Sequence, residues 1–352
     1  MHDPVKATGI IRRLCRKSWR WLLAVLGLAL AWHALKETTW DGVWDLLIRL
    51  NPAAILMLLG YNLILLPMMT ARWWLLIKSL GGSVSLGNTC MYRLAANAVS
   101  YLTPGPHFGG EPLSVYCLHQ RHDIPLPSAG ASVAVDRLLE LFASFGVLTF
   151  CLIHLSLSGS GILTGSREIT VAIALLVAAC CILAALFTGK RPFSRLMTLF
   201  KRLDHGSFPR IFKRIESWIA VIARSEDMAA SLYRDHRRLF LLANLISLAQ
   251  WFGVFVEFWL MARLLGTHLS FVQLTAVVMV ARMAFFTPIP AGIGVLESVL
   301  PWLTALLGLG HTLGFSLCLM IRSRDLLFNL TGLGLTVHYL TCRKSAGIIS
   351  RI

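Results

Sequence analysis

Residues 102–112 read LTPGPHFGGEP, and residues 286–297 read FTPIPAGIGVLE. Each stretch carries a Thr-Pro pair, at least one further proline, at least two glycines and a glutamate, and each lies between long apolar segments. Proline and glycine end helices, so both stretches predict one helix that stops and a second helix that starts. Paired interruptions of this kind in the two halves of an apolar chain are typical of the substrate site of a membrane transporter.

The composition places both stretches inside a membrane protein. The chain has 352 residues, of which 56% are hydrophobic and only 14% are charged. About 20 apolar residues of helix cross a hydrocarbon core, and backbone groups in lipid must bond within their own segment. The polar–apolar alternation of a membrane barrel is absent from the sequence. We therefore predict an all-α polytopic integral membrane protein with about six full transmembrane helices, at residues 21–35, 52–77, 126–157, 169–188, 239–264 and 313–340.

Basic residues predict the orientation of these helices, because cytoplasmic loops are enriched in Lys and Arg. The chain carries 33 Lys and Arg residues, which gather in residues 1–20, 189–238 and 343–351. A further basic group flanks the first interruption: Arg72, Lys78, Arg93 and Arg121. We expect both termini in the cytoplasm, an uncleaved signal-anchor at residues 21–35, and a basic amphipathic cytoplasmic loop at residues 189–238. A net charge of +16 would also suit nucleic-acid binding, but the sequence shows no nucleic-acid-binding module, so no nucleic-acid partner is predicted.

Three local matches relate the two halves of the chain. Residues 74–81 (WLLIKSLG) resemble residues 259–266 (WLMARLLG), 185 positions later. The two Thr-Pro pairs lie 184 positions apart, and the Asp-Arg-Leu-Leu run at 136–139 resembles the Arg-Asp-Leu-Leu run at 324–327. On the expected topology the related segments run in opposite directions, which predicts an inverted repeat. We therefore predict a single membrane domain, 1–352. Its first repeat spans 52–157 and contains a re-entrant helical hairpin at about 90–112. Its second repeat spans 239–340 and contains a re-entrant hairpin at about 271–310.

The chemistry expected at each interruption is anion binding. A helix that begins there has unpaired N–H groups and the positive end of its dipole, which attract anions. The glycines let a ligand approach the backbone closely. A phosphate head group fits these features, although a tightly packed turn without a ligand explains them as well.

Ionisable side chains within the apolar segments are costly and mark candidate functional sites. Asp136, Arg137 and Glu140 have helical spacings that allow an ionic cluster. Two roles are open for these charges: they contact phosphate, or they brace the helices against the hairpins. Three roles are open for the glutamates after the interruptions: they couple protons, hold a lipid amine or cap a helix. The predicted lipid head-group site comprises Arg93, Thr103, Gly109, Gly110, Glu111, Asp136, Arg137, Glu140, Arg282, Thr287, Gly292, Gly294, Glu297, Arg322, Arg324 and Asp325.

Catalytic motifs are missing from the sequence. It contains no metalloprotease H-E-x-x-H, no P-loop, no nucleophile elbow and no dinucleotide fingerprint. The eight cysteines form no C-x-x-C pair, and the eleven histidines are scattered. We therefore predict no catalytic residue, no metal and no cofactor. His107 and Glu111 form the one close pair that could serve an intramembrane enzyme as nucleophile or base.

The pattern resembles the flippase-like transmembrane family built on the membrane domain of lysylphosphatidylglycerol synthases. The residues that carry the resemblance are the Gly-Gly-Glu-Pro run at 109–112, the Asp-Arg-Leu-Leu run at 136–139 and the proline-glycine pattern at 288–297. The run EPLSVY at 111–116 is also similar to the hopanoid-biosynthesis-associated branch of that family. The sequence departs from the synthase pattern in two respects. It stops at Ile352, so we expect no soluble aminoacyl-transferase domain, and Ala291-Gly292 replaces a Gly-Gly pair.

The resemblance implies a multi-pass protein of the bacterial inner membrane that moves lipids between leaflets. Together with the interruptions, it predicts translocation of a phosphate-bearing lipid, which is an anionic or zwitterionic phospholipid or a polyprenyl or hopanoid lipid. Two alternatives stay open: an intramembrane enzyme acting on a lipid phosphate or polyprenyl-linked substrate, and an accessory subunit of a lipid-synthesis complex. Assembly into a homo-oligomer is compatible with the sequence, which does not determine the oligomeric state.

Overall fold

The structure is a computed structural model that describes residues 52–103, 109–158, 166–203, 209–287, 289 and 292–349. The expected signal-anchor at 21–35 lies outside the described residues, as do His107 and the prolines at 104, 106, 288 and 290.

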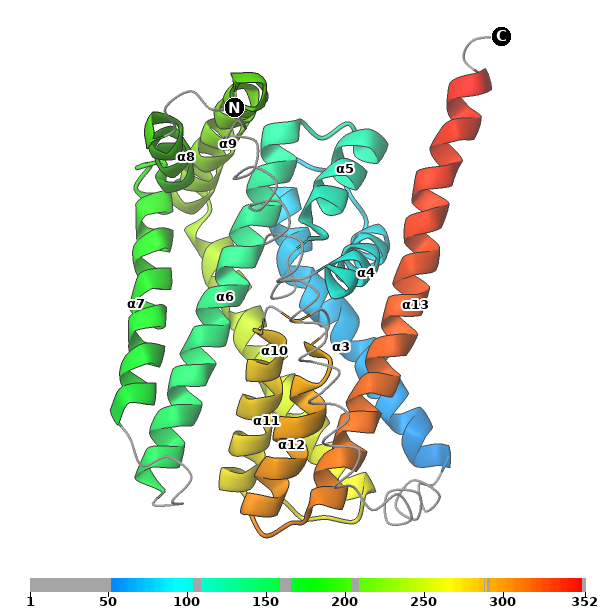
Figure 1. Ribbon diagram of the computed structural model, residues 1–352. Helices are drawn as coiled ribbons and strands as arrows, with labels where there is room; N and C mark the ends of the chain where they lie inside the picture. Colours follow the sequence, from blue (N-terminus) through cyan, green and yellow to red (C-terminus); the bar gives the residue numbers. More distant parts are fainter. Residues whose placement is uncertain are drawn as a thin grey trace, which may run out of the picture. The chain divides into compact units, whose positions relative to one another are not determined.

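Every regular element in the described residues is a helix, which agrees with the all-α prediction (Figure 1). The first half holds α3 (Pro52–Ser79), α4 (Leu86–Leu102), α5 (Glu111–His122), α6 (Leu126–Leu157) and α7 (Ser166–Phe187). The basic segment that follows holds α8 (Pro192–Leu203) and α9 (Pro209–Asp235). The second half holds α10 (Arg237–Leu264), α11 (Phe271–Phe285), α12 (Val295–Leu306) and α13 (His311–Ile349).

Three of these helices are long and apolar enough to cross a membrane: Ile55–Ser79, Leu126–Leu157 and Arg237–Leu264. They match three of the spans predicted from the sequence. The apolar side chains of α10 support the same conclusion, because Leu241, Leu245, Leu248 and Phe252 are between 60% and 72% exposed and share one helical face. A continuous exposed apolar stripe is unfavourable in water and suits contact with lipid tails.

The chain divides into two compact units, and each unit is built from segments that are separate in the sequence. Among the described residues, the first unit holds residues within 52–59, 95–110 and 257–334. The second unit holds residues within 60–94, 111–256 and 335–349.

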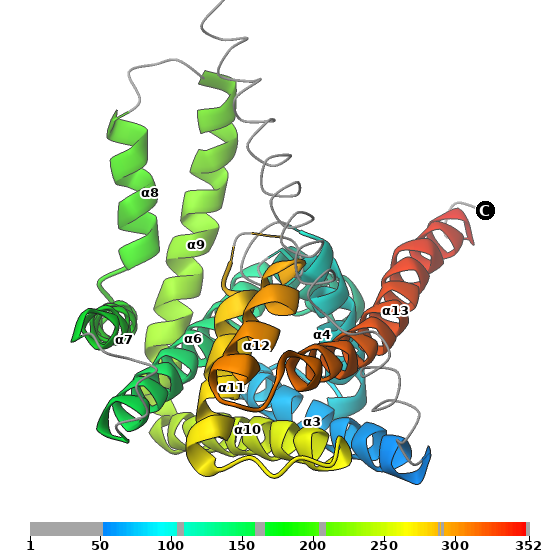
Figure 2. The same ribbon diagram turned by 60° about the horizontal axis from the view of Figure 1, so that its bottom comes forward.

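The second unit is organised around α6, which packs against α5, α7 and α9 (Figure 1). Its buried apolar core draws on α3, α6, α7, α9 and α10, through Leu76, Val135, Leu139, Leu186, Ala229, Leu232 and Ala243. Helix α8 lies beside α9 (Figure 2). The buried carboxylate of Glu226 on α9 accepts the N–H groups of Phe193 (2.6 Å) and Ser194 (3.2 Å), so it caps the first turn of α8.

The first unit contains a helical hairpin made of α11 and α12, which lie side by side (Figure 1). Ser270 caps the start of α11 in a capping box with Gln273. Helix α13 packs tightly on α12 at Gly314, where an added Cβ would lie 2.5 Å from the Cα of Pro301. That contact requires glycine at position 314.

Candidate functional site

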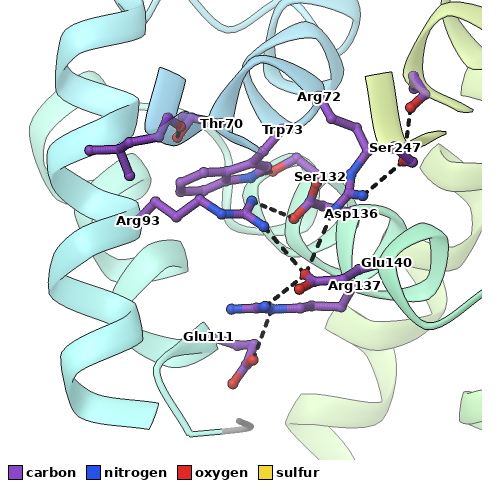
Figure 3. Close-up of polar contacts among 12 residues, drawn as sticks. Thr70, Arg72, Trp73, Arg93, Glu111, Ser132, Asp136, Arg137, Glu140 and Ser247 are labelled. Atoms are coloured by element: carbon purple, nitrogen blue, oxygen red, sulfur yellow. Dashed lines mark hydrogen bonds and ion pairs between the residues drawn. The ribbon is translucent and has the colours of Figure 1, made fainter. Parts of the chain in front are cut away.

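The first ion network lies in the second unit and is centred on Asp136 of α6 (Figure 3). Its carboxylate accepts hydrogen bonds from Arg72 Nε on α3 (2.7 Å) and Arg93 Nη1 on α4 (2.8 Å). Arg72 also donates from Nη1 to the hydroxyl of Ser247 on α10 (2.9 Å). The side chains of Arg72 and Arg93 are only 1% and 5% exposed, so these contacts replace the water that both cations lose.

Arg137 extends this network to the start of α5. Its guanidinium lies 3.1 Å from Glu111, the first residue of α5, and 2.9 Å from Glu140 one turn along α6. Glu140 also lies 3.3 Å from Arg93. Three arginines therefore face three carboxylates, which leaves the network balanced in charge. The predicted cluster of Asp136, Arg137 and Glu140 forms, and its members join three further helices.

Arg72 corrects one assignment made from the sequence. The count of basic residues placed it with the charges that flank the first interruption, whereas its side chain is buried inside the span Ile55–Ser79. The available signal was an arginine within an apolar helix, which is itself a mark of a functional site.

The second ion network lies in the first unit and is centred on Arg322 of α13. Its Nε and Nη2 atoms contact the two carboxylate oxygens of Glu297 at 2.7 and 3.2 Å. Nη2 also donates to the carbonyl oxygen of Gly292 (3.1 Å), and Nη1 donates to the hydroxyl of Tyr101 (2.9 Å). Arg322 was a predicted site residue; Tyr101 was not, and nothing in its sequence context signals the contact.

These contacts link the end of α4 to the second interruption of the sequence. Tyr101 lies at the end of α4, just before the first interruption, while Gly292 and Glu297 belong to the second. Tyr101 and Gly292 are 191 positions apart in the sequence, yet one guanidinium bonds to both within a single compact unit.

A neighbouring pair on α13 involves Arg324 and Asp325. Arg324 donates to Asp325 from Nε (3.0 Å) and Nη2 (2.7 Å), and from Nη1 to the carboxylate of Glu257 on α10. Glu257 is only 2% exposed. Here a single arginine serves two carboxylates, in contrast to the balanced network around Asp136.

The helices stop and start where the prolines and glycines predict. Helix α4 ends at Leu102 and α5 begins at Glu111, while α11 ends at Phe285 and α12 begins at Val295. Gly294 has φ +86° and precedes α12, and its N–H donates to Glu297 (2.7 Å). That bond gives Glu297 a capping role in addition to its ion pair.

The first glycine pair has a structural reason. The N–H of Gly110 donates to Ser100 Oγ (2.9 Å), and an added Cβ on Gly110 would lie 1.9 Å from the carbonyl oxygen of Ala96. The close approach that glycine allows is thus to α4 of the same chain. Gly109, with φ +149°, lies similarly close to Thr103.

Two of the remaining predicted residues, Thr103 and Thr287, have local hydrogen bonds. The hydroxyls of Thr103 and Thr287 bond to the carbonyls of Ser100 (2.9 Å) and Ala284 (2.6 Å), at the ends of α4 and α11. Arg282 is half-buried on α11, and none of the contacts described above involves it. Within the described ranges, no three His, Cys, Asp or Glu side chains gather as a metal site would require.

Comparison with known proteins identifies the family. Residues 19–332 match the family model described as "Lysylphosphatidylglycerol synthase TM region". A UPF0104 membrane protein of Methanothermobacter thermautotrophicus is 22% identical over 267 residues, which cover 73% of this chain and 76% of that protein. A UPF0104 membrane protein of Methanocaldococcus jannaschii is 29% identical over 100 residues, which cover 28% of this chain and 30% of that protein. The chain is therefore a membrane protein that belongs to the family of the lysylphosphatidylglycerol synthase TM region.

Proposed function

We propose that this protein moves a phosphate-bearing lipid between the leaflets of the bacterial cytoplasmic membrane, without chemical change to the lipid. The observation that carries the proposal is that Arg322 bonds to the second interruption, through Gly292 and Glu297, and to Tyr101, next to the start of the first. Arg322 is partly buried beside these helix ends, and its guanidinium offers a fork of donors suited to phosphate oxygens. The lipid tails would remain in the bilayer while the head group passes the arginines.

Helix lengths support two re-entrant hairpins. Helices α4 and α5 have 17 and 12 residues, and α11 and α12 have 15 and 12. At 1.5 Å per residue each is about 18–26 Å long, less than the roughly 30 Å of a hydrocarbon core. Irregular backbone at membrane depth is tolerated where protein or a water-filled cavity surrounds it.

Equivalent ion pairs support the inverted repeat. In the first repeat, Glu111 after the interruption pairs with Arg137 on the following long helix. In the second repeat, Glu297 pairs with Arg322 in the same way. The two glutamates are 186 positions apart and the two arginines 185, close to the separation of the WLLIKSLG and WLMARLLG runs. A second pair of contacts follows the same spacing. Arg72 binds Asp136 on α6 and Glu257 binds Arg324 on α13, and Arg72 and Glu257 are also 185 positions apart.

The proposal can be tested with purified protein in vesicles of phosphatidylcholine and phosphatidylglycerol that contain a trace of fluorescent phosphatidylglycerol. Wild-type protein should expose inner-leaflet lipid to an external quencher faster than protein-free vesicles do. Arg322→Ala should slow that movement about tenfold or more, because a charge-assisted contact of roughly 1.5–3 kcal/mol is lost. Arg191→Ala is the matched control, since Arg191 pairs with Asp227 at an exposed position.

Two outcomes would contradict the proposal. Equal rates in protein-free and wild-type vesicles would remove lipid translocation altogether. Equal rates for wild type and a folded Arg322→Ala variant would remove Arg322 from the pathway. Size-exclusion chromatography of each variant separates loss of function from loss of fold.

A further inference from the structure

The Arg322–Glu297 pair raises the question of how a lipid phosphate would reach the arginine. Glu297 binds the guanidinium side-on, with one oxygen against Nε and the other against Nη2. The two non-bridging oxygens of a phosphodiester bind arginine through the same fork. A phosphodiester would therefore compete with the Glu297 carboxylate for the same donors.

Charge decides what happens to Glu297 when the phosphodiester arrives. Arg322 carries one positive charge and Glu297 one negative charge, so the pair is neutral as it stands. Among the described residues, Arg322 and the thiol of Cys318 on α13 face Glu297, and the hydroxyl of Tyr101 on α4 accepts a hydrogen bond from Arg322. Asp325, one turn further along α13, is already paired with Arg324, which also serves Glu257. A second anion beside an ionised Glu297 would leave uncompensated negative charge in a membrane interior, which is strongly unfavourable.

We propose, on the basis of the translocation function above, that Glu297 is the resident anion of Arg322 and gives way to a lipid phosphodiester only by taking up one proton. The proton comes from the aqueous phase and is held on the Glu297 carboxyl while the phosphodiester bonds to Arg322. When the lipid leaves, Glu297 releases the proton and returns to Arg322. Lipid binding is then linked to the uptake of one proton.

Glu297 suits this role better than its counterpart Glu111. Arg137, the partner of Glu111, also holds Glu140 at 2.9 Å, so loss of Glu111 leaves that arginine paired. Glu297 makes the two-atom contact with Arg322 and accepts the N–H of Gly294 as well. Its displacement therefore frees a phosphate-sized set of donors in one step.

The test measures proton uptake when a lipid binds. Dihexanoyl phosphatidylglycerol is added to detergent-purified wild-type protein in weakly buffered solution containing a pH dye, and bound lipid is measured by calorimetry. We expect uptake approaching one proton per bound lipid, and an affinity that weakens as the pH rises, by up to about tenfold per pH unit. Dihexanoylglycerol, which lacks the phosphodiester, should cause no uptake.

Variants then assign the proton to Glu297. Glu297→Gln should bind the lipid without proton uptake and with an affinity independent of pH, whereas Glu297→Asp should retain the uptake. Asp227→Asn, at an exposed pair far from this chemistry in sequence, should behave as wild type.

The outcomes separate this inference from the proposed function. Wild-type protein that moves lipid in vesicles, and binds it without proton uptake, overturns the inference and leaves translocation standing. Unchanged uptake in a folded Glu297→Gln variant also overturns it. Failure of wild type to move lipid overturns both. If Glu297→Gln does not fold, the wild-type measurement alone decides.

Discussion

Asp136 is the residue on which the first ion network depends, because it accepts hydrogen bonds from Arg72 and Arg93 at once. Replacement by asparagine removes the charge that compensates two almost fully buried guanidinium groups. Breaking a buried ion pair in this way costs about 3–5 kcal/mol. We expect Asp136→Asn to unfold at a markedly lower SDS mole fraction than wild type in mixed micelles, as followed by circular dichroism.

Asp227→Asn provides the matched control for that prediction. Asp227 contacts Arg191 through two hydrogen bonds of 2.8 Å, but both side chains are about half exposed. Water and salt screen exposed pairs, so their contribution to stability is small and this variant should unfold close to wild type. Equal destabilisation by the two substitutions would show that burial does not set the strength of the Asp136 contacts.

At the residue scale, the sequence predicts contacts within a helix better than contacts between helices. Arg137 and Glu140 are three positions apart, and helical geometry alone brings them together. Arg72 and Asp136 are 64 positions apart, so their pairing depends on how α3 packs on α6. The same limit applies to Tyr101 and Arg322, whose separation of 221 positions has no local pattern.

At the element scale, the turn between α4 and α5 is set by the lack of a side chain at Gly110. The N–H of Gly110 bonds to Ser100, and the backbone lies too close to Ala96 to admit a Cβ. Gly110→Ala forces these segments apart, and substitutions that overpack a close contact cost typically 1–3 kcal/mol. We expect a lower thermal unfolding temperature in detergent, together with slower lipid movement in vesicles.

Gly146→Ala is the control for Gly110→Ala, because Gly146 lies within α6 and nothing occupies the space its Cβ would take. Alanine is favoured over glycine inside a helix by about 1 kcal/mol, so this variant should be as stable as wild type or more stable. A Gly110→Ala variant that is as stable as Gly146→Ala would contradict the close contact with Ala96.

The ends of helices were the most predictable elements. Thr-Pro stops α4 and α11 for a reason that is purely local, since proline cannot continue the hydrogen-bond pattern. The start of α5 at Glu111 and of α12 after Gly294 follow from the glycines and the proline beside them. The division of the chain into compact units was not predictable, because it cuts through α3, α4, α10 and α13 and depends on packing between distant segments.

At the scale of the whole molecule, the inverted repeat makes a prediction about sidedness. In the proposed repeat, the loop between α3 and α4 corresponds to the loop between α10 and α11, and Ser83 and His268 are exposed positions within these loops. If the repeats run in opposite directions, these loops face opposite sides of the membrane. With cytoplasmic termini, the loop containing Ser83 faces the cytoplasm and the loop containing His268 faces the exterior.

Labelling of one introduced cysteine at a time, in intact cells, tests that arrangement. A membrane-impermeant maleimide should label His268→Cys without cell disruption, and should label Ser83→Cys only after the membrane is opened. The parent chain measures background from the exposed native Cys180 and Cys181, which lie on α7. Labelling of both variants from the same side would mean that the two repeats share one orientation. The re-entrant hairpins would then enter from a single face, and a path with access alternating between the leaflets could not be built from these two interruptions.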